Sequence, residues 1–138
     1  MFFIALVLGF KGGVNDKKAF LLVILSLFIS VILIKIIHLF YFEPRPFIAS
    51  NFIPLVKEAN DASFPSRHAT ISAVIALAFT YFKSKWSLLF LFLMLWVGIS
   101  RVYVGVHYPW DILGGFITAA VALIISLQIK KILSRLFL

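Results

Sequence analysis

Long runs of apolar residues, separated by short polar stretches, dominate the sequence. The runs cover residues 1–10, 19–41, 69–82, 86–104 and 110–129. A helix needs about 20 mostly apolar residues to cross the hydrocarbon core of a bilayer, and several of these runs reach or approach that length. The pattern therefore predicts an all-α bundle of about five apolar segments that crosses a membrane several times.

The composition agrees with a membrane protein. The chain of 138 residues fits a single domain, 1–138, and it is 63% hydrophobic but only 13% charged. Its net charge of +8 raises the question of nucleic acid as a partner. The basic residues form neither one run nor one helical face, so we expect no nucleic-acid binding. The composition leaves the oligomeric state open.

Eight of the 13 lysines and arginines lie in three stretches that alternate with the apolar runs. They are Lys11, Lys17 and Lys18, then Lys83 and Lys85, and finally Lys130, Lys131 and Arg135. Alternating spans bring all three stretches to one side, and basic loops mark the cytoplasmic side. Residues 43–68 and 103–111 then lie outside. We expect a multi-pass protein of a bacterial or archaeal plasma membrane, with its polar site on the extracytoplasmic side.

The first polar cluster is residues 43–46, where two prolines end the second apolar run. Arg45 then lies at the outer membrane surface. Taken alone, it is well explained as an arginine that extends its charge to the lipid headgroups. A guanidinium also presents planar donors that suit phosphate oxygens.

The second polar cluster, residues 63–70, leads into the third apolar run. Ser63 or Ser66 can cap the helix that begins there. Free backbone N–H groups at a helix N-terminus bind anions such as phosphate, and His68 would lie in the first turn near the same anion. A plain helix cap with a histidine at the interface is the alternative.

The third polar cluster contains Arg101, His107 and Asp111. Pro109 suits the first turn of a helix, so Asp111 can reach back to His107. An aspartate on one imidazole nitrogen fixes the tautomer and leaves the other nitrogen free to attack. A structural His–Asp pair is the alternative. Ionisable residues at membrane depth cost roughly 2.5–3.5 kcal/mol each, which favours a functional role.

Together the three clusters resemble the type 2 phosphatidic acid phosphatase (PAP2) superfamily. Its signature is a lysine, six residues and Arg-Pro; then Pro-Ser-Gly-His; then Ser-Arg, five residues, His, three residues and Asp. The third part is complete in residues 100–111. Residues 64–70 and 101–109 are most similar to the bacitracin-resistance type of undecaprenyl diphosphate phosphatases.

The resemblance implies hydrolysis of a lipid phosphate or diphosphate through a phosphohistidine, without a cofactor. His107 would be the nucleophile, Asp111 would orient it, and His68 would act as acid and then as base. Zinc ligation by Asp61 and these three residues is conceivable. The nearby arginines would repel a divalent cation, so we expect no metal.

The sequence departs from the signature at two site positions. His38 stands where the lysine is expected, and Lys35 lies one turn earlier on a similar face. Arg67 replaces the glycine of the second part. The family usually has six spans, which leaves two expectations for this chain: a minimal member, or a bundle that lacks the first span. The expected phosphate ligands are Arg45, Ser66 and Arg101, with Lys35, His38 and Arg67 as further candidates.

Several functions remain open at this point. The substrate of such a phosphatase could be undecaprenyl diphosphate, phosphatidate or phosphatidylglycerol phosphate, because the expected site residues touch only phosphate. A transferase that passes phosphate to another lipid is a further possibility. A non-enzymatic membrane protein is the alternative outside enzymes.

Overall fold

The fold is all-helical, as predicted, over residues 1–136, which are the residues that the computed structural model describes. Each of the five apolar runs forms a helix, and a short helix that was not predicted lies in the longest loop. The helices are α1 (Phe2–Lys11), α2 (Val14–Phe40), α3 (Pro46–Ala49), α4 (Arg67–Tyr81), α5 (Ser87–Tyr103) and α6 (Pro109–Leu136).

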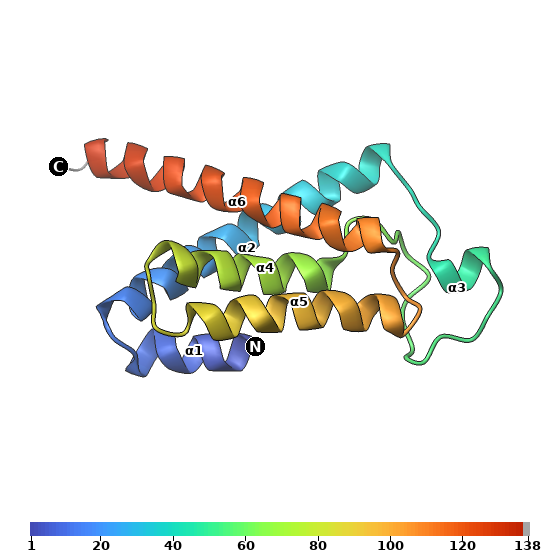
Figure 1. Cartoon of the computed structure of the whole chain (residues 1–138). Helices are drawn as coiled ribbons and strands as arrows, with labels where there is room; N and C mark the ends of the chain where they lie inside the picture. Colours follow the sequence, from blue (N-terminus) through green and yellow to red (C-terminus); the bar gives the residue numbers. More distant parts are fainter. Residues whose placement is uncertain (137–138) are drawn as a thin grey trace.

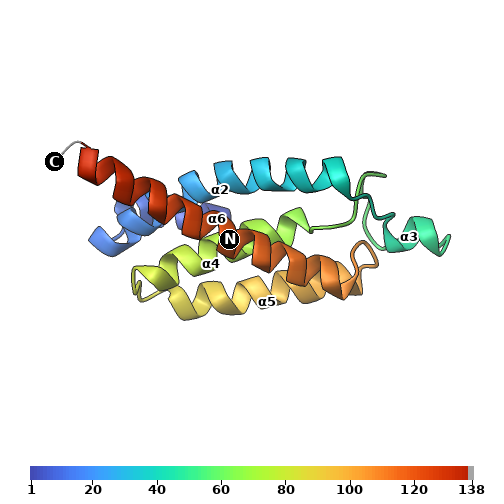
Figure 2. The ribbon, with the colours of Figure 1, turned by 90° about the horizontal axis from the view of Figure 1, so that it is seen from above.

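Helix α4 forms the centre of the bundle. It packs against α2, α5 and α6, and the two perpendicular views show these three helices around it (Figures 1 and 2). Small side chains such as Ala69, Ala73 and Ala76 are fully buried on α4 and let its neighbours approach closely. At 15 residues, α4 is only about 22 Å long. Its role is to carry the core of the bundle.

Helices α2 and α6 are longer than their apolar runs. Helix α2 begins at Val14 because the Asp16 side chain accepts the Gly13 N–H at 3.0 Å and so caps the first turn. Helix α6 continues through its basic end, where positive side chains complement the helix dipole. With 27 and 28 residues, both are long and apolar enough to cross a membrane.

The two ends of the bundle differ in character. The α1–α2 turn, the α4–α5 turn and the end of α6 lie at one end (Figure 1). These segments hold the three basic stretches. The starts of α4 and α6 lie at the other end, beside α3 and the long loop that follows α2. The predicted separation of the basic loops from the polar clusters is therefore present in the structure.

Two close contacts fix how α6 sits on its neighbours. A Cβ added to Gly115 would lie 2.8 Å from the Ser66 carbonyl oxygen, so this glycine lets α6 touch the start of α4. Further along, the buried Ser26 hydroxyl donates to the Ser126 hydroxyl at 2.9 Å and joins α2 to α6.

Candidate active site

The loop between α2 and α4 covers the ends of the helices that carry the polar clusters. Backbone hydrogen bonds hold it in place: the Ser63 N–H donates to the Glu43 carbonyl at 2.8 Å, and the Ser66 N–H donates to the Asp111 carbonyl at 3.0 Å. The Leu55 N–H reaches the Val104 carbonyl at 3.2 Å. All three polar clusters are thereby brought to one end of the bundle.

The predicted pair of His107 and Asp111 is formed, and both side chains are buried. His107 Nδ1 lies 3.3 Å from Asp111 Oδ2. The same oxygen accepts the Tyr108 N–H at 2.8 Å and a short hydrogen bond from the Ser63 hydroxyl. Because Nδ1–H donates to Asp111, the lone pair lies on His107 Nε2 and points away from the carboxylate.

Arg45 is the group that His107 Nε2 faces. Its Nη1 lies 3.3 Å from Nε2 and donates to the Val106 carbonyl at 3.1 Å. Its Nε and Nη2 both donate to Asp61 Oδ1, at 3.1 and 2.8 Å. Arg45 is 1% exposed, far from the freely snorkelling arginine that was the alternative. A phosphoryl group at Nε2 would find a guanidinium donor already beside it.

Arg101 forms an ion pair with Glu58 of the loop. The other oxygen of Glu58 lies 3.9 Å from Arg45 Nη2, so one carboxylate reaches both predicted phosphate ligands. Arg101 Nε is buried without a hydrogen-bond partner among the described residues. Arg101 and Arg45 therefore already lie beside an anion, which is the carboxylate of Glu58.

Asp61 joins two of the predicted arginines. One of its oxygens takes the Arg45 bonds, and the other accepts from Arg67 Nη2 at 2.5 Å. Partial burial on its own would raise the pKa of this carboxyl. The hydrogen bond and charge of Arg45, with the charge of Arg67, outweigh burial and lower the pKa. Asp61 is therefore ionised, and it forms ion pairs with Arg45 and Arg67.

His68 lies in the first turn of α4, which begins at the same end of the bundle as α6, and His107 precedes α6 by two residues. Partial burial and the charge of Arg101 lower its pKa below the ordinary histidine value, and His107 and Arg67 act in the same direction. Glu58 opposes this shift. His68 is therefore near enough to feel the charges of Arg101 and Arg67, which together with Arg45 form the arginine cluster of the site.

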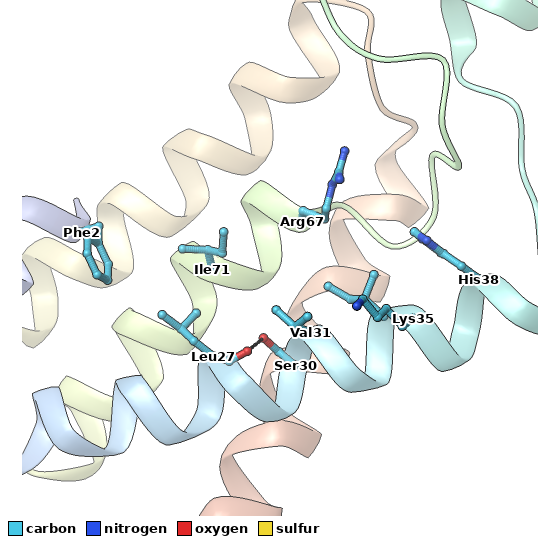
Figure 3. Close-up of a pocket in the computed structure, with 9 residues that line it drawn as sticks. Phe2, Leu27, Ser30, Val31, Lys35, His38, Arg67 and Ile71 are labelled. Atoms are coloured by element: carbon cyan, nitrogen blue, oxygen red, sulfur yellow. Dashed lines mark hydrogen bonds between the residues drawn. The ribbon is translucent and has the colours of Figure 1, made fainter.

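The remaining phosphate candidates divide into two groups. Ser66 is buried and caps α4, accepting the Ala69 N–H at 3.4 Å. Lys35, His38 and Arg67 line a cavity between α2 and α4 instead (Figure 3). His38 Nε2 lies 3.1 Å from the Phe64 carbonyl oxygen, so it anchors the loop.

The sequence did not indicate that three further residues belong to the site. Ser63 was predicted only as a possible helix cap, Asp61 was considered only as a conceivable zinc ligand, and Glu58 was not considered. Each belongs to an irregular loop, where neither helical spacing nor a local motif indicates which side chains turn inward. Within residues 1–136, no three histidine or acidic side chains gather as a metal site. The absence of a metal from the reaction stays a prediction.

The fold and these residues define a class of protein. Residues 19–135 match the PAP2 superfamily, and the chain belongs to that family. It is 36% identical over 120 residues to the undecaprenyl-diphosphatase BcrC of Bacillus subtilis, covering 86% of this chain and 61% of that protein. It is 31% identical over 129 residues to an undecaprenyl-diphosphatase of Sulfolobus acidocaldarius, covering 92% of this chain and 61% of that protein.

A solved structure supports the same fold. The crystal structure of LpxE from Aquifex aeolicus superposes with a TM-score of 0.75 at 25% identity, covering 92% of this chain and 75% of that one. The chain spans 61% of the length of each of these two curated relatives, or about three fifths.

Proposed function

We propose that this chain is a membrane phosphatase that hydrolyses a lipid diphosphate through a phosphohistidine, with undecaprenyl diphosphate as the favoured substrate. The observation that carries the proposal is the orientation of His107. Asp111 engages Nδ1, while Nε2 faces a buried arginine at 3.3 Å. An oriented imidazole beside a guanidinium is suited to attack phosphorus. The two undecaprenyl-diphosphatase relatives support the choice of substrate.

The reaction proceeds in two transfers. His107 Nε2 attacks the terminal phosphorus, and the bond from that phosphorus to the bridging oxygen breaks. His68, as the imidazolium, gives its proton to the leaving lipid phosphate. Water then attacks the phosphohistidine, His68 takes a proton from this water, and the phosphorus–nitrogen bond breaks. Inorganic phosphate leaves, and His107 returns to its starting state.

Electrostatics favours different roles for His68 and His107 in the proposed reaction. The lowered pKa of His68 keeps its imidazole mostly neutral at pH 7 while the site holds no phosphate. The negative charge of an incoming phosphate favours the imidazolium, so substrate binding itself supplies the acid. Arg45 and Arg101 then stabilise the charge of the transferring group.

The apolar surface of the bundle supports a position in the bilayer. Large apolar side chains are exposed on the outer faces of the long helices, including Leu21, Phe28, Leu88, Ile99, Leu113 and Ile117. Water does not favour so much exposed apolar surface, but lipid does. The basic end then faces the cytoplasm and the arginine cluster faces outside. Sealed vesicles that release phosphate only from substrate on the cytoplasmic leaflet would contradict this orientation.

One labelling experiment tests the chemistry. Undecaprenyl diphosphate carrying a radioactive terminal phosphate is mixed with purified protein and quenched in alkali within one turnover. We expect alkali-stable, acid-labile label on the wild-type protein and none on His107→Ala. Phosphatidate and phosphatidylglycerol phosphate, assayed beside it, decide the substrate. Phosphate release by His107→Ala at the wild-type rate would remove the phosphohistidine from the mechanism.

A further inference from the structure

A cavity of about 700 Å³ lies between α2 and α4, beside the cluster of arginines. Its walls are apolar along most of their length, with Leu27, Val31 and Ile34 from α2 and Ile71 from α4. Lys35 and His38 on α2 and Arg67 at the start of α4 line it as well (Figure 3). The cavity therefore combines an apolar wall with a cationic mouth.

The mouth of this cavity is close to the reacting groups. Arg67 contacts Asp61, which in turn contacts Arg45, and Arg45 lies beside His107. A single carboxylate thus separates Arg67 from the guanidinium that faces the nucleophile. Two linked phosphates would therefore meet two neighbouring guanidinium groups.

His68 connects the cavity to the reaction from the other side of α4. A smaller hollow that contains His68 shares Phe2 and Ile71 with the α2–α4 cavity, so the two adjoin. The group that gives a proton to the leaving oxygen is therefore next to the space where the leaving group would lie.

Lys35, His38 and Arg67 differ in how many of their hydrogen-bond donors are available to a ligand. His38 is engaged with the Phe64 carbonyl oxygen. Arg67 uses Nη2 for Asp61, and its other N–H donors make no hydrogen bond within residues 1–136. Its side chain is 49% exposed, and Lys35 is exposed too. Arg67 and Lys35 can therefore bind an anion without breaking an existing hydrogen bond.

We infer that Arg67 and Lys35 bind the retained phosphate of a lipid diphosphate, and that the α2–α4 cavity takes the adjoining part of its hydrocarbon chain. The inference rests on the proposed function and adds a second phosphate site to it. In this arrangement the terminal phosphate lies between His107, Arg45 and Arg101. The retained phosphate leaves with the lipid after the bridging bond breaks. A lipid monophosphate has no second phosphate for Arg67, so Arg67 favours diphosphates.

The test compares two substrates with the same chain, undecaprenyl diphosphate and undecaprenyl phosphate. Loss of a hydrogen bond between charged groups predicts that Arg67→Gly lowers the ratio of their kcat/KM values by about ten- to a hundred-fold. Arg67→Lys restores part of the ratio. Lys57→Gly removes an exposed positive charge from the neighbouring loop and is the control, for which the ratio stays at the wild-type value.

The outcomes separate the inference from the proposed function. An active Arg67→Gly protein with an unchanged ratio, whether both activities fall together or neither falls, overturns the second phosphate site alone. A folded wild-type protein that releases phosphate from neither substrate overturns the proposed function.

A second pair of variants tests the chain-binding wall. Val31 lines the cavity, whereas Val121 is exposed on α6 and lines none of the cavities that touch the site. Val31→Trp fills the cavity and is expected to raise KM for undecaprenyl diphosphate about ten-fold, but to change KM for geranyl diphosphate much less. Val121→Trp leaves both KM values unchanged. Equal effects of Val31→Trp on the two chain lengths would place the chain elsewhere.

Discussion

Glu58, in the loop between α2 and α4, forms an ion pair with Arg101 near the end of α5. The same carboxylate lies 3.9 Å from Arg45. One acidic side chain therefore partly offsets the charge of two arginines that are expected to hold phosphate oxygens. This limits the cost of bringing two positive charges together near His107. It also means that a phosphate must compete with Glu58.

Replacing Glu58 changes that competition. Glu58→Gln removes the charge that competes for Arg101, so inorganic phosphate is expected to inhibit the variant at about ten-fold lower concentration than the wild type. The measurement is the inhibition constant for phosphate at fixed ionic strength. Glu43→Gln is the control, because Glu43 bonds Trp110 at 3.0 Å and contacts neither arginine. Equal inhibition constants for wild type and Glu58→Gln would show that the carboxylate stays in place when phosphate binds.

Ser63 is expected to matter for the rate more than for substrate binding. Its hydroxyl donates to Asp111, and it lies 3.3 Å from His107 Nδ1. Ser63→Ala leaves Asp111 with fewer donors, so kcat should fall by about ten-fold while KM changes little. Ser72→Ala removes another buried serine, one that only donates to the Ala69 carbonyl of its own helix. An equal loss of kcat in both variants would assign the effect to packing.

The pH dependence of the reaction should report His68. In the proposed mechanism the imidazolium is the required acid. We therefore expect kcat/KM to fall as pH rises through the pKa of His68 in the free protein, which lies below the ordinary histidine value. Bound phosphate raises that pKa, so the basic limb of kcat lies at higher pH. Glu58 raises the pKa of His68, and Glu58→Gln should therefore move the kcat/KM limb to lower pH. Coincident limbs for kcat and kcat/KM would argue against His68 as the acid.

Gly115 offers a test of the packing that brings the clusters together. An added Cβ would lie 2.8 Å from the Ser66 carbonyl oxygen, which is backbone and cannot move aside alone. Gly115→Ala should cost about 1–3 kcal/mol of stability and lower Tm by several degrees. A Cβ on Gly13 would lie 3.8 Å from the nearest Asp16 oxygen, so Gly13→Ala at the start of α2 is the control, with a smaller loss of Tm. An unchanged Tm for Gly115→Ala would mean that the helices separate easily.

The sequence predicted the helices and much of the polar site for identifiable reasons. Apolar runs of span length leave few alternatives to helices in lipid. The spacing of His107 and Asp111 across the start of a helix predicted their contact, which is observed. The roles of these residues in catalysis stay predictions.

What the sequence did not predict lies mostly in the loop. Glu58 and Asp61 turn toward arginines that are distant in the chain, and only the folded arrangement of three helix ends brings them together. The short helix α3 was missed because the two prolines indicated only that α2 must end. Lys35 and His38 were considered as ligands of the reacting phosphate. The structure places both along the α2–α4 cavity, and their role stays a prediction.

The hydrogen bond between Ser26 and Ser126 has a consequence for substrate length. Helix α2 forms one wall of the cavity, and α6 carries Asp111. Sliding either helix along the other by one turn would strand a hydroxyl in an apolar interior, where no water can replace its partner. This hydrogen bond therefore opposes a change in the axial offset of the two helices. In the proposed complex, the depth of the cavity below the reacting phosphate is then a set length for the lipid chain.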